Sequence, residues 1–348
     1  MTMDSGKRYL VVPDLLKGLV ILWIVMFHVY KDFPDVFCSS LHWLTNLQCR
    51  IIMHGALGVD IFIILSGYLL ATSRLRNPQV HWFSFLRKRI WRIFPLYWFA
   101  LAAILTLETV IGSSEESLNL PSVLYHLAGL HGFTSYIFDL QGAWWFVTLI
   151  LQLYLLFPVI WYLSEKLPLY VLLILAACCT VSARFIPFAN LDGNYSVFAF
   201  LPDFVFGLVM ARKLSPNLQC SFSFTGGLYC IVAMIALIIG IYNDSVMVFK
   251  YGWGLFRPFV SSGLFLTLCC LCHHGIIRIP AVTYPLSKYG RHSYAIYLFH
   301  RPLIYKWVTL SLPVLPPVLV SFVFVAAMLP MGMLIEVGES RLLKRFNN

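Results

Sequence analysis

Ionisable side chains interrupt three stretches of the sequence that are otherwise apolar. Lys17 and His28 fall in residues 10–30, Asp60 in residues 51–72 and His300 in residues 291–309. An ionisable group in the middle of a hydrocarbon layer costs about 2.5–3.5 kcal/mol on insertion scales, so it is retained where it has a partner or a chemical task. These four residues are therefore the first candidates for proton transfer or for stabilising charge.

Lys17 and His28 share one helix face if residues 10–30 are helical. Eleven residues at 100° each return to within about 20° of the starting direction and rise about 16 Å. Both side chains would then point into a bundle of helices, three turns apart. The alternative is that Asp14 pairs with Lys17 three residues away and that His28 forms a hydrogen bond at the membrane interface.

Asp60 enters an apolar helix and must find a proton, a cation or hydrogen-bond donors. An ion pair with Lys17 or with protonated His28 fits the sequence as well as a catalytic role does. Gly58 and Gly67 lie on either side of Asp60, and we expect them to allow close contact between helices.

A polar stripe follows one face of residues 291–309. Ser293, Tyr297 and His300 recur at i, i+4 and i+7, so they face something other than lipid. The stripe is consistent with a lined substrate path and equally with hydrogen bonds between helices.

A basic cluster of Arg87, Lys88, Arg89 and Arg92 lies at the start of the apolar stretch 92–111. Arg89 and Arg92 point the same way on a helix, and planar guanidinium groups bind phosphate oxygens in pairs. The cluster therefore fits the docking of a phosphate-bearing cofactor. It also fits contact with anionic lipid head groups.

The composition shows what kind of element must position these residues. Hydrophobic residues make up 60% of the 348 residues, charged residues only 11%, and the mean hydropathy is +0.80. A water-soluble fold cannot absorb this apolar excess, so we predict an all-α, polytopic membrane helix bundle. About ten segments are long enough to cross roughly 30 Å of hydrocarbon as helices. They are 10–30, 51–72, 92–111, 144–163, 168–186, 197–211, 222–242, 255–273, 291–309 and 313–336.

The positions of the charges predict the orientation of the bundle. Basic residues gather at alternate ends of the ten segments, and the positive-inside rule makes that side cytoplasmic, with both termini. The 112–143 connection carries Glu115, Glu116 and Asp139 but no Lys or Arg, which suits an external loop. Topology thus accounts for the formal net charge of +10, and no nucleic-acid partner is expected.

The cysteines predict no metal centre, because none of their spacings matches a metal-ligand pattern. Cys38 and Cys49 share the first external connection. The sequence allows them to form a disulfide or to remain free thiols. The first apolar segment lacks a small-residue cleavage pattern and is expected to remain as a mature span. We expect residues 1–348 to form a single integral-membrane domain with no appended soluble domain.

Taken together and in this order, these motifs resemble the membrane acyltransferase 3 family, whose members modify carbohydrates of bacterial envelopes. The likeness extends over almost the whole chain. It rests on Lys17-Gly18 with His28, Gly58 to Phe62, Leu65 to Tyr68, Arg89 and Arg92 before Pro95, Trp145-Phe146 with Tyr154 and Pro158, and Ser293-Tyr294 with Tyr297 and His300.

The resemblance implies transfer of an acyl group, most simply acetyl from acetyl-CoA, to a sugar hydroxyl of a surface glycan or its lipid-linked precursor. The implied phosphate-binding residues are Arg89 and Arg92, assisted by Arg87 and Lys88. His28 would be the base, oriented by Asp60 and tuned by Lys17, because a sugar hydroxyl needs a base with a pKa near 7. The implied substrate path is lined by Ser66, Trp145, Tyr297 and His300.

The resemblance also implies a setting for the reaction. The chain would be a multi-pass protein of the cytoplasmic, or inner, cell membrane, in contact with the lipid bilayer. Its partners would be acyl-CoA, the glycan acceptor and other enzymes of glycan assembly.

The sequence departs from the family pattern at two residues. Lys17 replaces a commoner Arg and loses the guanidinium fork. Ile150 stands where many members carry a Glu. In this respect the chain resembles the branch of the family that includes enterobacterial-antigen acetyltransferases. Without the hydrolase-like domain that some members append, the chain would act alone or pass its acyl group to a partner.

Two other classes of function remain open on the sequence. Lys17, Asp60, His28 and His300 also fit a proton or substrate relay in a membrane transporter or exporter. A non-catalytic membrane partner in a glycan-assembly complex is the third class. Cleavage of a thioester by the purified protein distinguishes the enzyme from both.

Overall fold

The computed structural model describes residues 11–38, 43–111, 119–185, 195–213, 224–242 and 253–346. Within these ranges the chain is almost entirely helical and contains no strand, which confirms the predicted all-α class.

A helix lies at each of the ten predicted apolar segments. These helices are α1 (Val11–Asp32), α4 (Leu57–Arg76), α5 (Trp82–Ile111), α7 (Trp145–Lys166), α8 (Leu169–Phe185), α9 (Val197–Lys213), α10 (Phe224–Tyr242), α11 (Trp253–Cys270), α13 (Ser293–Ser311) and α14 (Pro317–Phe346). Five segments of the described chain are long and apolar enough to cross a membrane: Val11–Asp32, Leu47–Arg76, Trp145–Lys166, Phe256–Gly275 and Pro317–Gly338. The number of ten spans and the side on which the termini lie stay predictions.

Short helices fill several connections. They are α2 (Pro34–Phe37), α3 (Trp43–Met53), η1 (His54–Ala56), α6 (Leu120–Leu127), η2 (His131–Phe133), η3 (Ser135–Phe138), η6 (Leu271–Gly275), η7 (Ile276–Arg278) and α12 (Pro280–Arg291). Most of these helices lie in predicted connections, whereas η1, the last residues of α3 and the start of η6 fall inside the predicted spans 51–72 and 255–273, which are therefore not continuous α-helices. Helix α5 also begins ten residues before the predicted span, so the basic cluster lies within its first turns.

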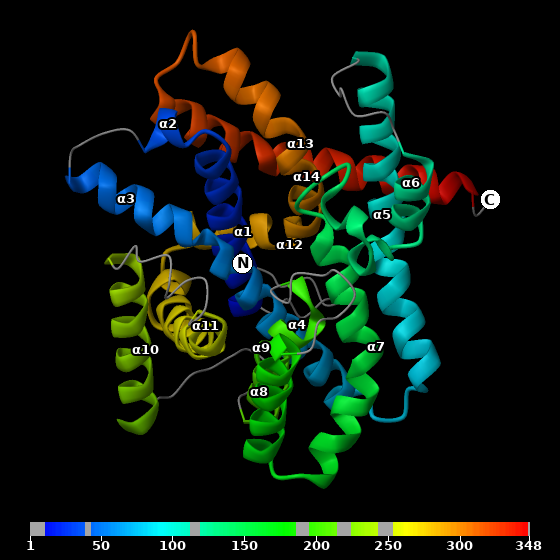
Figure 1. The fold of residues 1–348 in the computed structure, drawn as a ribbon, viewed down its shortest axis with the longest axis vertical. Helices are drawn as coiled ribbons and strands as arrows, with labels where there is room; N and C mark the ends of the chain where they lie inside the picture. The colour runs from blue at the N-terminus through cyan, green and yellow to red at the C-terminus, as the bar shows by residue number, and fades with distance from the viewer. Residues whose placement is uncertain are drawn as a thin grey trace.

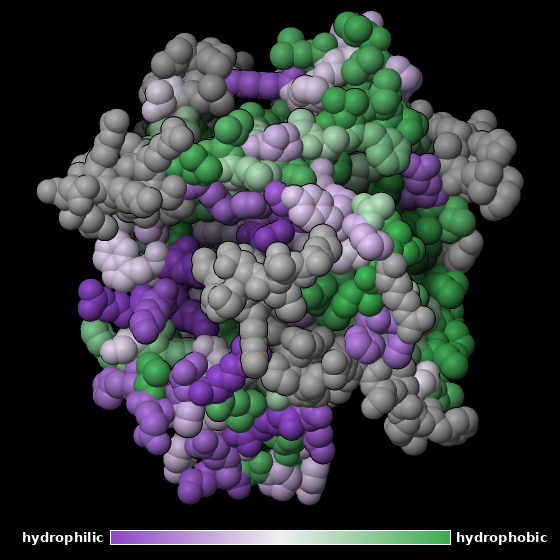
Figure 2. Space-filling model, turned by 180° about the vertical axis from the view of Figure 1, so that it is seen from behind, coloured by the Kyte–Doolittle hydropathy of each residue, from purple (hydrophilic) through white to green (hydrophobic). Residues whose placement is uncertain are grey.

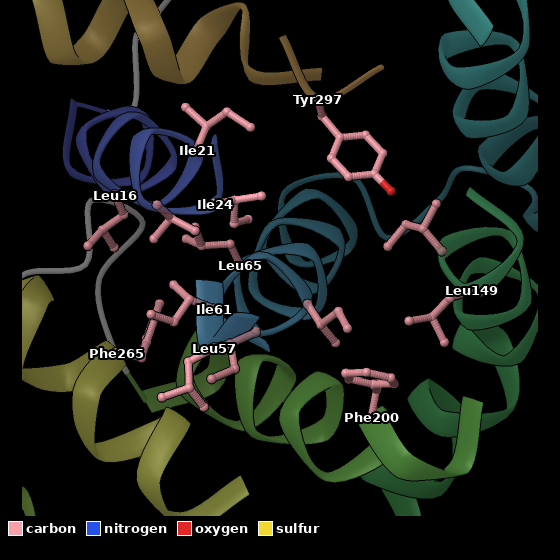
Figure 3. Packing of buried hydrophobic residues seen from close by; sticks show 14 of the residues in the cluster. Leu16, Ile21, Ile24, Leu57, Ile61, Leu65, Leu149, Phe200, Phe265 and Tyr297 are labelled. Atoms are coloured by element: carbon pink, nitrogen blue, oxygen red, sulfur yellow. The ribbon is translucent and has the colours of Figure 1, made fainter. Parts of the chain in front are cut away.

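Helices α1 and α4 form the centre of the bundle. In Figure 1 they lie near the middle of the view, with α13 and α14 above them, α10 and α11 to one side and α5 to the other. The close-up in Figure 3 shows Ile21 and Ile24 of α1, Ile61 and Leu65 of α4, and Phe200 of α9 converging on the shared core. Ile21, Ile61 and Phe200 are fully buried.

Glycines bring the central helices close together. Gly67 of α4 lies against the main chain of Phe204 on α9, and Gly207 of α9 lies against the main chain of Ile64 on α4. A methyl group at either glycine would collide with backbone, which cannot move aside as a side chain can. This confirms the expected packing role of Gly67, and small residues of this kind are enriched where membrane helices meet.

The outer surface is strongly apolar over whole helices. Figure 2 shows hydrophobic residues over large parts of one face, while hydrophilic residues gather towards its lower left. Helix α10 exposes aliphatic side chains along one face, at i, i+3, i+4 and i+7, while Ala233 and Leu237 on its other face are buried, as expected where one side of a helix meets lipid. These exposed residues are Leu228, Ile231, Val232, Ile235, Ile238 and Ile239. The surface is that of an integral membrane protein.

A disulfide joins Cys38, at the end of α2, to Cys49 in α3, with the two Cα atoms 5.7 Å apart. This settles the pairing that the sequence left open. The bond ties the end of α1, through α2, to the helix that leads into α4.

Candidate functional site

Two cavities lie between the central helices. The first, which we call the histidine chamber, has a volume of about 750 Å³ and includes His28, Lys31, Arg257 and Arg301 in its lining. The second, which we call the arginine chamber, has a volume of about 670 Å³ and includes Lys17, Arg89, Arg92 and Arg291. Three residues, Ile24, Val59 and Tyr297, line both cavities, so the two chambers adjoin at these side chains.

Tyr297 stands at the junction of the chambers. Figure 3 shows its ring projecting from α13 into the space between the central helices. Its hydroxyl donates a hydrogen bond to the carbonyl of Ala143, just before α7 begins. The ring packs edge-on against Phe146, with centroids 5.4 Å apart. Tyr297 is thus fixed at the point where the two chambers adjoin.

His28 lines the histidine chamber, and one of its ring nitrogens has no partner in the described part of the chain. Its Nδ1 atom is buried and has no hydrogen-bond partner among the described residues. The ring lies beside that of His300, with centroids 5.1 Å apart. An imidazole nitrogen that has no hydrogen-bond partner can take a proton from a bound hydroxyl.

His300 is held in one tautomer by its main-chain contacts. Its Nδ1 atom lies 2.7 Å from the carbonyl oxygen of Tyr297, and a carbonyl oxygen can only accept a hydrogen bond. The Nδ1 atom must therefore carry the proton, which leaves a lone pair on the Nε2 atom. That Nε2 atom is buried without a partner in the described part of the chain.

Asp60 does not have the partners predicted for it. Its carboxylate lies against Arg257 of α11, with the Oδ1 atom 2.7 Å from Nε and the Oδ2 atom 2.9 Å from Nη2. Lys17 instead pairs with Asp14 at 3.3 Å, which is the local ion pair that the sequence offered as an alternative. Asp60 therefore orients Arg257. The predicted pairings of Asp60 with His28 and with Lys17 are wrong. A role for Asp60 in catalysis stays a prediction.

Lys17 and His28 line different chambers. Both extend from α1, as the shared helix face predicts, but the helix rise between them carries one to each cavity. Lys17 therefore belongs with Arg89 and Arg92, and its contribution is charge at the arginine chamber.

The arginine chamber is lined by cations on three helices. Lys17 comes from α1, Arg89 and Arg92 from α5 and Arg291 from the end of α12, whereas Asp14 is the single carboxylate among the described lining residues. Ser66 and Tyr154 also line it. The excess of guanidinium and ammonium groups fits phosphate oxygens. Arg87 and Lys88 are exposed and outside this lining.

Aromatic rings form one wall of the histidine chamber. Trp145 stacks on Phe200 with centroids 5.6 Å apart, and Tyr195 meets Trp145 at 5.0 Å and Phe138 at 4.9 Å. The predicted substrate-path residues are thus divided between the cavities. Trp145 lines the histidine chamber, Ser66 the arginine chamber and Tyr297 both, while His300 is buried beside His28.

Two further histidines lie in the connection between α5 and α7. The rings of His126 and His131 stack with centroids 4.1 Å apart. Burial lowers the pKa of both, and that of His131 falls to about 3. His131 is therefore neutral near pH 7, and its Nε2 atom is bound to the carbonyl of Trp144 at 3.0 Å. We assign the pair to packing of this connection.

Sequence reasoning missed Arg257 and its neighbour Asp203. Both lie in predicted apolar spans, 255–273 and 197–211, so the rule that identified Asp60 applies equally to them. Asp203 is fully buried and accepts a hydrogen bond from the hydroxyl of Ser261 at 2.5 Å. No group of three or more potential metal ligands occurs among the residues that the structure describes.

Comparison with known proteins identifies relatives of this chain by sequence. The acyltransferase domain model of the acyltransferase 3 family matches residues 11–337. The putative membrane-bound transacylase BcsY of Komagataeibacter xylinus is 26% identical over 314 residues, which cover 83% of this chain and 71% of the relative. The O-acetyltransferase OatA of Staphylococcus aureus (strain NCTC 8325 / PS 47) is 20% identical over 336 residues, 86% of this chain and 51% of the relative.

A eukaryotic relative is matched over a shorter region. The regulator of hypoxia-inducible factor 1 from Caenorhabditis elegans is 28% identical over 188 residues, 48% of this chain and 37% of the relative. The chain thus spans about half the length of the O-acetyltransferase and little more than a third of the regulator. No solved structure matches the chain significantly.

Proposed function

The chain belongs to the acyltransferase 3 family, and from this premise we propose that it moves an acetyl group from cytoplasmic acetyl-CoA to a hydroxyl of a surface glycan or its lipid-linked precursor. Its relatives include a putative transacylase and an O-acetyltransferase, so it is a membrane acyltransferase. The donor, the acceptor and the residue roles are our proposal.

The observation that carries the proposal is the adjoining pair of chambers. Arg89 and Arg92 bind the phosphates of the donor in the arginine chamber, and Lys17 adds positive charge there. The pantetheine arm reaches the junction at Ile24, Val59 and Tyr297. The thioester then lies within reach of an acceptor held in the histidine chamber.

His28 acts as the base in this proposal. It takes the proton of the acceptor hydroxyl as that oxygen attacks the thioester carbonyl carbon. The carbon–sulfur bond breaks, and the departing thiolate receives the proton from the imidazolium. His300 is a positioning residue, because its ring is fixed by the main chain of Tyr297 and packs beside the His28 ring. These steps describe a direct transfer, in which the acceptor oxygen takes the acyl group without an acyl-enzyme.

The proposal is tested with purified protein in lipid nanodiscs. Release of free thiol from acetyl-CoA and transfer of labelled acetyl are measured for the wild type, His28→Ala and Arg89→Ala/Arg92→Ala. We expect His28→Ala to bind donor normally and to transfer at least about 100-fold more slowly, the usual contribution of a general base. The double variant should raise the donor dissociation constant at least tenfold.

Arg76→Ala is the matched control, because Arg76 is exposed at the end of α4 and lies outside both chamber linings. It removes one positive charge and should change neither donor binding nor transfer. Full transfer by His28→Ala would overturn the base assignment. Solute flux through the wild-type protein without any thioester cleavage would favour the transporter instead.

A further inference from the structure

The polar side chains of the histidine chamber are strongly biased towards hydrogen-bond donors. Its charged lining residues are Lys31, Arg257 and Arg301, and its other side chains with hydrogen-bonding groups are two histidines, two tyrosines and Trp145. No Asp, Glu, Asn or Gln occurs among the described residues that line it. Lys and Arg donate hydrogen bonds and accept none, so the chamber calls for a ligand that accepts.

The two arginines keep donors free after binding their own carboxylates. Arg257 donates a hydrogen bond from Nη2 to Asp60, with its Nε atom 2.7 Å from the other carboxylate oxygen, and its guanidinium lies over the Phe200 ring at 4.4 Å. Arg301 contacts Asp32 through Nη2 at 3.1 Å. A guanidinium carries five N–H groups, so one carboxylate does not satisfy it. Asp60 and Asp32 are not part of the lining, so the cations face the cavity.

Lys31 adds a third positive charge at the end of α1. Its ammonium group lies 5.5 Å from the centre of the Phe27 ring, and its side chain is exposed. It follows His28 by three residues, so both project on the same side of α1. An anion bound by Lys31 would therefore be held close to the imidazole.

A neutral sugar is poorly matched to this set of groups. Each hydroxyl both donates and accepts, and a site for it needs acceptors as well as donors. A carboxylate or phosphate only accepts, and its bonds to Arg and Lys are roughly twice as strong as those between neutral groups. The aromatic wall of Trp145, Tyr195 and Phe200 provides apolar contact for the rest of the ligand.

We propose that the histidine chamber binds an acceptor that carries an anionic group, a carboxylate or a phosphate, through Lys31, Arg257 and Arg301. The anion fixes the orientation in which a hydroxyl of the same molecule faces His28. The inference rests on the proposed function in taking this chamber as the acceptor site. The carboxylate of an acidic sugar and the phosphate of a lipid-linked precursor supply the same chemistry.

The test compares matched pairs of ligands on the full chain in nanodiscs. Methyl glucuronide is paired with methyl glucoside, and a short-chain prenyl-phosphoryl glucose with the prenyl glucoside that lacks the phosphate. Calorimetry measures their binding without any acyl donor. We expect the charged member of at least one pair to bind at least tenfold more tightly. The pair that shows the larger ratio identifies the source of the anion.

Variants link this preference to the chamber. Lys31→Gln and Arg301→Gln should each weaken binding of the preferred anionic ligand roughly tenfold and leave its neutral partner unchanged. Lys166→Gln, at the exposed end of α7, is the control that removes a cation outside the lining. Equal binding of charged and neutral ligands, or equal losses for both, would overturn the inference.

The binding assay separates this inference from the proposed function. His28→Ala is expected to keep the preference for the anionic ligand, because the imidazole is not one of the three anion-binding groups. If His28→Ala retains full acyl transfer, the base assignment fails while the anion preference is still measured. If the wild type shows no anion preference but His28→Ala loses transfer, only the present inference fails.

Discussion

The Asp60–Arg257 pair joins a fully buried carboxylate to a guanidinium that faces the histidine chamber. Asp203 is also fully buried, and its hydrogen bond comes from Ser261 on the same helix as Arg257. Removing charges from water is costly, so such a pair contributes to stability only while both members are present. The pair fixes α4 to α11 and sets where the guanidinium stands in the chamber.

Replacing Arg257 with Gln should destabilise the protein strongly. The change leaves the Asp60 carboxylate buried without its cation, which typically costs about 3–5 kcal/mol. Thermal unfolding in detergent, followed by size-exclusion chromatography, measures the effect. The double variant Arg257→Gln/Asp60→Asn removes the unpaired charge and should recover part of the loss. Equal melting temperatures for the single and double variants would show that the charge pair does not govern stability here.

Single residues were predictable where the chemistry is local. The rule that ionisable groups in apolar segments have partners or tasks identified His28, Asp60 and His300, and the local pair of Lys17 with Asp14 was among the alternatives. The partner of Asp60 was not predictable, because Arg257 lies 197 positions away and periodicity carries no information on which helices meet. The division of Lys17 and His28 between two cavities likewise depends on packing by other helices.

At the scale of elements, the junction between the chambers is built from three helices. Ile24 comes from α1, Val59 from α4 and Tyr297 from α13. The side chains of Ile24 and Val59 carry no hydrogen-bonding groups, so they separate the two cavities by their bulk alone. Tyr297 is held by its hydrogen bond to the Ala143 carbonyl.

A larger side chain at Val59 should block the passage without disturbing donor binding. Val59→Trp fills space at the junction, while Arg89 and Arg92, the proposed phosphate-binding residues, stay in place. We expect the acetyl-CoA dissociation constant to change less than threefold and acetyl transfer to fall at least about 100-fold, because the thioester is displaced from the base. Val59→Ala, which widens the passage, is the control and should remain active. Undiminished transfer by Val59→Trp would place the route elsewhere.

The positions of the long helices were predicted well from the hydrophobicity of the sequence. A helix lies at every apolar segment that was predicted, because a segment that is apolar over about twenty residues has few other ways to satisfy its backbone in lipid. The errors concern polar or short segments. Helix α5 continues back to Trp82 through Arg87 and Lys88, since Arg and Lys are good helix formers and need no bilayer to be helical. Helix α12 packs along α1, where Gly18 and Gly290 permit close approach.

At the scale of the whole molecule, three independent features mark one end of the bundle. The histidine chamber opens near the end of α1 that carries Lys31, the Cys38–Cys49 disulfide follows directly, and residues 119–143 contribute Phe138, Gly142 and Ala143 to the same chamber. Structural disulfides form in oxidising compartments. The arginines of α5 line the other chamber, where the proposed cytoplasmic donor would enter.

This arrangement predicts which side of the membrane each chamber faces. Leu130 is exposed in the connection that borders the histidine chamber, and Arg87 is exposed near the arginine chamber. A membrane-impermeant maleimide should label Leu130→Cys in intact cells and Arg87→Cys only after the cells are opened, with the parent chain as the background control. The reverse pattern would put the disulfide in a reducing compartment and the basic cluster outside. It would contradict both the positive-inside rule and the proposed entry of a cytoplasmic donor at Arg89 and Arg92.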